Sequence, residues 1–268
     1  MQPCISEATT MPSTFAEDVA HYADAACPGI EVWLTKLETH LETHSLTDSR
    51  KLTEDCGLIL AAAAYQGGLL LSQGEARQAH NDHFRRRLEI CQALSIPTIL
   101  VVADFVEAVD QTALERAVVS LTQAGQWAQG FGVKLALEFR GQSMFCASLD
   151  TAVALVSQCG QANVGINLDV FHFYTGPSKF EDLMLLTADK LFHVQVCDLA
   201  GVPRELATDG DRILPGDGDF QLGAIVEWLR RLDYRGWVSL ELMNPTLWRI
   251  PGAQLTEIGM SALTKLLR

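Results

Sequence analysis

The chain has 268 residues, 48% of them hydrophobic and 20% charged, so it can bury a large core as one barrel or as two smaller domains. Its formal net charge of −13 argues against a broad phosphate-binding surface, because nucleic-acid-binding proteins usually present a basic face. No apolar run reaches the length of a membrane span, and the N-terminus lacks the features of a secretory signal. We therefore expect neither a nucleic-acid partner nor a membrane association.

The seven cysteines are scattered, odd in number and without a CxxC pair. This pattern is typical of reduced thiols that fill a core, rather than of a disulfide framework or a zinc finger. It predicts a cytoplasmic protein.

Apolar, partly β-branched runs alternate with helix-like stretches along the whole chain. Strands are expected near residues 3–9, 29–34, 57–64, 98–103, 133–139, 164–171, 191–197 and 236–242. Helical periodicity is clear at 74–96 and 111–132, and "PTILVVADF" is typical of a strand buried on both faces. This alternation predicts one (β/α)8 TIM barrel that forms a single domain over residues 1–268. The alternative is an open doubly wound sheet, but no GxGxxG follows the first strand.

Oxygen-bearing side chains stand at the ends of four consecutive expected strands, the fifth to the eighth. They are Glu138 in "LALEF", Asp169 in "INLDVFH", Gln195 in "FHVQVCD" and Glu241 in "VSLELMNP". In an α/β barrel, chemistry takes place at this end of the strands. Three carboxylates directed into one barrel mouth would repel one another without a cation. The sequence therefore predicts one divalent metal ion held by these four residues.

This pattern resembles the xylose isomerase-like TIM-barrel superfamily, which includes sugar phosphate isomerases and epimerases and an AP endonuclease 2-like branch. The resemblance is strongest from about residue 133 to residue 248, and "EVW" at 31–33 and "SLEL" at 239–242 also look like family sequence. The resemblance implies that Glu138, Asp169 and Glu241 occupy metal-ligand positions.

Two further motifs of this family match the chain. "LDxxH" matches Leu168 to His172, and "DRxxPGxG" matches Asp211 to Gly218. The resemblance implies that His172, on a loop after its strand, and Arg212 bind the substrate. Without it, His172 would be an ordinary loop histidine, and Arg212 could pair with a neighbouring aspartate.

The chain departs from the family at the seventh strand. The family usually has the second histidine of an "HxH" pair there, whereas "HVQ" places Gln195 at this position. An amide oxygen is a hard ligand, so the set favours Mg²⁺ or Mn²⁺, while Co²⁺ or Zn²⁺ is also compatible. His193 is the alternative ligand, although it lies deeper along the strand.

The resemblance implies a metal-dependent isomerase or epimerase of a small carbohydrate or cyclic polyol, in which Glu138 and Glu241 transfer protons beside a metal-bound carbonyl. The alternative is a dehydratase (a lyase) of the 3-dehydroshikimate or inosose type. A nuclease of the endonuclease IV type would need more histidine ligands and a basic groove, and intact Glu138 and Glu241 argue against a catalytically silent binding protein. A homo-oligomer is compatible with the sequence.

Overall fold

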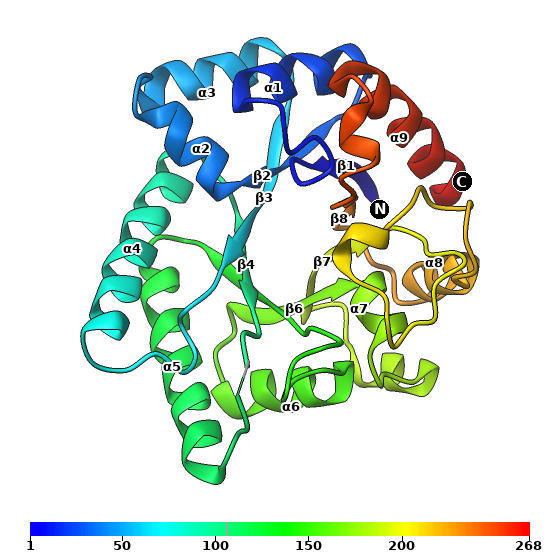
Figure 1. Cartoon of the computed structure of the whole chain (residues 1–268). Coiled ribbons are helices and arrows are strands. Elements are labelled where there is room, and N and C mark those ends of the chain that lie inside the picture. The colour runs from blue at the N-terminus through cyan, green and yellow to red at the C-terminus, as the bar shows by residue number, and fades with distance from the viewer. Residues whose placement is uncertain (106) are drawn as a thin grey trace. The chain divides into compact units, whose positions relative to one another are not determined.

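The computed structural model of the protein describes residues 1–105 and 107–268, in which strands and helices alternate (Figure 1). The strands are β1 (Gln2–Ser6), β2 (Gly29–Trp33), β3 (Ile59–Gln66), β4 (Thr98–Val102), β5 (Lys134–Glu138), β6 (Val164–Asp169), β7 (Leu191–Val196) and β8 (Trp237–Leu240). The α-helices are α1 (Phe15–Asp24), α2 (Leu34–Leu41), α3 (Leu46–Asp55), α4 (Gly74–Ala93), α5 (Gln111–Gly130), α6 (Leu149–Cys159), α7 (Val170–Thr175), α8 (Leu222–Arg231) and α9 (Gly252–Leu267). Short 3₁₀ helices are η1 (Phe180–Leu185), η2 (Asp209–Asp211) and η3 (Leu247–Arg249). None of the helices within the described ranges is both long enough and apolar enough to cross a membrane.

The strands follow one another in chain order, from β1 to β8, in a closed barrel. The (β/α)8 fold expected from the sequence is therefore confirmed. The two long predicted helices, α4 and α5, end at Ala93 and Gly130, slightly earlier than expected. One local expectation is wrong: His172 lies in helix α7 rather than in a loop, because the chain turns directly from β6 into that helix.

The chain divides into two compact units, which are described separately. Unit 1 consists of Met1–Ala63 and His193–Arg268. In it, β1 pairs in parallel with β2 on one side and with β8 on the other, and β8 also pairs with β7. In the last of these pairs Gln195 lies opposite Ser239. Helices α1 and α9 lie side by side (Figure 1). Unit 1 therefore contains the carboxyl ends of β1, β2, β7 and β8.

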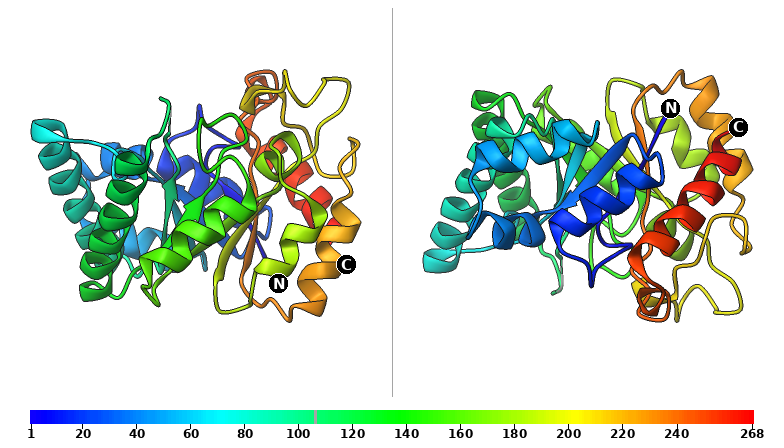
Figure 2. Two further views of the ribbon diagram at one scale, coloured as in Figure 1. Left: turned by 90° about the horizontal axis from the view of Figure 1, so that it is seen from below. Right: turned by 90° about the horizontal axis from the view of Figure 1, so that it is seen from above.

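Unit 2 consists of Ala64–Phe192. Here β5 pairs in parallel with both β4 and β6, and Glu138 lies opposite Asn167. Strands β4 and β6 are buried along their whole length, as their continuous apolar character predicts. Helices α4 and α5 run side by side (Figure 2), and Arg77 of α4 donates hydrogen bonds to Ser120 and Gln123 of α5. Unit 2 thus contains the carboxyl ends of β3, β4, β5 and β6.

A buried aspartate, Asp198, holds the long loop between β7 and α8 of unit 1. Its carboxylate accepts hydrogen bonds from the backbone N–H groups of Leu199 at 3.0 Å, Gly216 at 2.9 Å and Phe220 at 2.9 Å. The backbone of Asp198 also forms an antiparallel bridge with Ile213. One buried acid therefore fixes both ends of the segment that carries Arg212.

We expect Asp198→Ala to lower the free energy of unfolding by about 3 kcal/mol, because three backbone donors lose a charged acceptor inside the protein. Urea denaturation followed by circular dichroism measures this. Asp217→Ala, at an exposed position of the same loop, is the matched control and should change stability by less than about 0.5 kcal/mol. Equal effects of the two substitutions would contradict the anchoring role.

Candidate functional site

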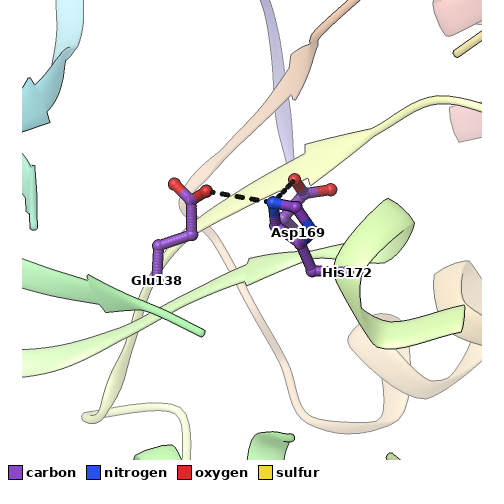
Figure 3. Close-up of side chains that lie close together, drawn as sticks. All are labelled: Glu138, Asp169 and His172. Atoms are coloured by element: carbon purple, nitrogen blue, oxygen red, sulfur yellow. Dashed lines mark ion pairs between the residues drawn. The ribbon is translucent and has the colours of Figure 1, made fainter. Parts of the chain in front are cut away.

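Three side chains from the ends of β5 and β6 converge in unit 2 (Figure 3). Glu138 is the last residue of β5, Asp169 is the last residue of β6, and His172 lies in α7 immediately afterwards. The Nε2 atom of His172 is 3.5 Å from Glu138 Oε1 and 3.6 Å from Asp169 Oδ2. All three residues are buried. Glu138 and Asp169, two acids predicted from strand ends, thus lie close together. His172, the predicted substrate-contacting histidine, lies beside them.

The other oxygen of each acid is held by a hydrogen bond. Asn167 donates from Nδ2 to Glu138 Oε2 at 3.1 Å. The backbone N–H of Phe171 donates to Asp169 Oδ1 at 2.8 Å, so Asp169 also caps the first turn of α7. These bonds direct Glu138 Oε1 and Asp169 Oδ2 toward His172.

The chemistry of this cluster fits a divalent cation. One ligand atom from each of Glu138, Asp169 and His172 lies within 4.8 Å of the other two. Neighbouring buried carboxylates repel each other unless a positive charge lies between them. Carboxylate oxygens with an imidazole nitrogen are common ligands of Mn²⁺, Zn²⁺ and related ions. The residues present are therefore suitable to hold such an ion.

The other predicted site residues lie together in unit 1. Gln195 donates from Nε2 to Glu241 Oε1 at 2.9 Å and to Glu31 Oε1 at 2.9 Å. The Nη1 atom of Arg212 is 3.0 Å from Glu241 Oε2, and its Nη2 atom is 2.8 Å from Asp209 Oδ1. Gln195, Glu241 and Arg212 are all buried. Arg212 does pair with a neighbouring aspartate, and it also contacts the predicted ligand Glu241.

His193, the alternative ligand on β7, contacts an acid that was not among the predicted ligands. Its Nε2 atom is 2.7 Å from Glu31 Oε2. Burial by itself raises the pKa of Glu31, but the hydrogen bond and the charge of His193, together with the neighbouring Ser6 and Ser239 side chains, bring that pKa below its usual value. Glu31 is therefore a hydrogen-bond acceptor over the physiological pH range.

Sequence reasoning did not assign a role to Glu31. It is an acid within the apolar run "GIEVW" of β2 and is fully buried. The search for acids at the carboxyl ends of strands did not select Glu31, because it is the middle residue of β2. Asn167 of β6, which sequence reasoning also did not assign, donates a hydrogen bond to Glu138.

A second group of buried charges in unit 1 surrounds Lys36 of α2. Its ammonium group donates to Asp18 Oδ2 at 2.5 Å and to the backbone oxygen of Thr10 at 2.9 Å. Glu7 Oε2 accepts from the backbone N–H of Trp33 at 2.7 Å. Burial, followed by the charge of Asp18, raises the pKa of Glu7 well above its usual value. Burial likewise raises the pKa of Asp18.

This cluster predicts a pH-dependent stability. The folded protein keeps the Glu7 proton to a higher pH than the unfolded chain, whose glutamates titrate near about 4.3. The stability that this group contributes is therefore present below that pH and is lost as the pH rises through the folded-state pKa. The glutamine of the variant Glu7→Gln cannot ionise, so the variant should not lose this stability. We expect its free energy of unfolding, relative to that of the parent, to rise by about 1 kcal/mol or more between pH 5 and pH 8.

Urea denaturation at the two pH values measures the difference. Glu54→Gln, at an exposed position of α3, is the control and should track the parent. A Glu7→Gln variant whose stability relative to the parent is the same at both pH values would contradict the prediction.

Comparison with known proteins identifies relatives that cover most of the chain. The family model described as "xylose isomerase-like TIM barrel" matches residues 19–266. An inosose isomerase from Halalkalibacterium halodurans is 27% identical over 258 residues, which cover 93% of this chain and 90% of that protein. A 3-dehydroshikimate dehydratase from Pseudomonas aeruginosa is 25% identical over 257 residues, which cover 95% of this chain but 40% of that protein. The crystal structure of the IolI protein with a bound zinc atom matches with a TM-score of 0.94 at 25% identity, covering 100% of this chain and 98% of that one.

Proposed function

Because this chain belongs to the xylose isomerase-like TIM-barrel family, we propose that it is a divalent-metal-dependent isomerase or epimerase of a ketose or cyclic polyol ketone. The observation that carries the proposal is the buried cluster of Glu138, Asp169 and His172, whose ligand atoms converge. The similarity to an inosose isomerase over nine-tenths of both chains supports a cyclic polyol ketone as the first substrate to test.

We assign Glu138, Asp169, Gln195 and Glu241 as the metal ligands. Their matched positions at strand ends support this, as do the contacts within each unit. Glu138 lies with Asp169, and Gln195 lies with Glu241. The zinc atom in the similar IolI structure supports a divalent ion, and the predominance of oxygen ligands favours Mg²⁺ or Mn²⁺. Such an ion would polarise a substrate carbonyl and acidify the adjacent C–H bond.

The proton transfers fall to Glu138 and Glu241, one of which removes the proton beside the carbonyl while the other returns it. Asn167 holds Glu138 through Oε2, and Arg212 holds Glu241 through Oε2. Both carboxylates are thereby fixed in orientation before a substrate arrives, which lowers the cost of reaching the reactive geometry. We assign the binding of substrate oxygens to His172 and Arg212.

A dehydratase is the second candidate, favoured by the similarity to a 3-dehydroshikimate dehydratase of which this chain spans 40%. It begins with the same proton removal but then expels a hydroxyl group from the next carbon as water. The departing hydroxyl needs a proton donor. His172 is the candidate because it lies beside the acids Glu138 and Asp169.

We expect Asp169→Asn and Glu241→Gln to reduce the metal content of the purified protein roughly tenfold, because each removes a charged ligand. Elemental analysis of protein never exposed to a chelator measures this. Glu181→Gln, an exposed position of unit 2, serves as the control with parental metal content. If both ligand variants retained as much metal as the control, the assignment would be wrong.

The reaction is tested by incubating the protein in D₂O with ketoses, inososes and 3-dehydroshikimate and weighing the products by mass spectrometry. We expect a product that carries one solvent deuterium and is otherwise unchanged in mass. We also expect Glu138→Gln and Glu241→Gln to lose about 10²- to 10⁴-fold in rate, as for removal of a general acid or base. A product lighter by one water would establish the dehydratase instead, and turnover that survives metal removal would exclude both.

A further inference from the structure

The acid Glu31 of β2 makes two hydrogen bonds to side chains of β7 and is completely buried. Its Oε1 atom accepts from Gln195 Nε2 at 2.9 Å, and its Oε2 atom accepts from His193 Nε2 at 2.7 Å. Nothing in the proton-transfer scheme or in the proposed ligand set uses this carboxylate. A buried charge is costly, so two specific partners on one strand indicate a defined role.

The two ends of the Gln195 amide are chemically different, and the surrounding acids distinguish them. An ionised carboxylate only accepts hydrogen bonds, whereas an amide has a donating NH₂ and an accepting oxygen. The NH₂ of Gln195 donates to Glu31 and to Glu241, both at 2.9 Å. The reversed amide would place its oxygen against two carboxylate oxygens, which is repulsive. The acids therefore fix which end of Gln195 is turned toward them.

Glu31 is itself held in place. His193 binds its second oxygen, so the carboxylate cannot rotate away from Gln195 without losing that bond. Parallel pairing of β1 with β2 fixes the backbone here, with Ser6 opposite Glu31. The acceptor that faces Gln195 is thus rigid, as a second group that orients a metal ligand has to be.

We propose that Glu31 is the positioning residue of the metal site, which keeps the Gln195 amide turned so that its carbonyl oxygen serves as the ligand. This inference rests on the proposed metal-binding role of Gln195. It explains how a glutamine can act at this position: a reversed amide would offer its NH₂ group, which cannot coordinate a cation.

The test is the Mn²⁺ affinity of metal-depleted protein, measured by titration calorimetry and by the paramagnetic resonance signal of free Mn²⁺. Glu31→Gln keeps the shape of the side chain but adds a donor, so the amide of Gln195 can reverse. We expect its Mn²⁺ affinity to fall roughly 10–100-fold, as for other groups that orient metal ligands. Glu31→Asp keeps an acceptor-only carboxylate, and we expect it to bind Mn²⁺ more tightly than Glu31→Gln.

The order of these two variants separates positioning from packing. If Glu31 only filled space, the shorter aspartate would be more damaging than the isosteric glutamine, and that order would overturn the inference. Parental affinity in Glu31→Gln would also overturn it. Glu7→Gln, another buried glutamate of unit 1 that bonds Trp33 rather than Gln195, is the matched control and should keep parental affinity. Failure of the proposed metal site is distinguishable, because the unsubstituted protein would then bind no Mn²⁺.

Discussion

Negative charge buried at the carboxyl ends of the strands is the constraint on which this molecule depends. An acid in such a place is stable only with a donor or a cation beside it. Three such acids have a specific partner: Asn167 for Glu138, the start of α7 for Asp169 and Arg212 for Glu241. Glu31, in the middle of β2, has His193. The polar residues Asn167 and His193 are therefore explained as hydrogen-bond donors to these acids.

His172 illustrates how two roles can compete for one atom. Its Nε2 nitrogen lies 3.5 Å from Glu138 Oε1 and 3.6 Å from Asp169 Oδ2. That nitrogen can coordinate a cation or donate to a substrate oxygen, but it cannot do both at once. With Gln195 as a ligand, His172 is available for the substrate, as the family resemblance implies. A dehydratase would use the same nitrogen to protonate the departing hydroxyl group, so the two candidate reactions differ in what one histidine does.

The barrel, the order of its strands and the ends of the fifth to eighth strands could be predicted from the sequence, because apolar runs and strand-end acids are local patterns. The helical position of His172 could not, since "DVFHFYT" is too short and too apolar to distinguish a helix from a loop. The role of Glu31 could not be predicted either, because it depends on contacts with Gln195 and His193, more than 160 positions later in the chain. Strand periodicity predicts which face of the sheet a residue occupies. Only the folded structure shows which hydrogen-bond donor contacts it.

The junction of β6 and α7 has a consequence for how this protein can vary. Asp169 ends the strand, caps the helix through Phe171 N–H and lies beside His172, all within four residues. Successive helical residues are about 100° apart around the axis, so one inserted or deleted residue here would swing the histidine away from the acid. Among related chains, we therefore expect the segment from Asp169 to His172 to keep a constant length.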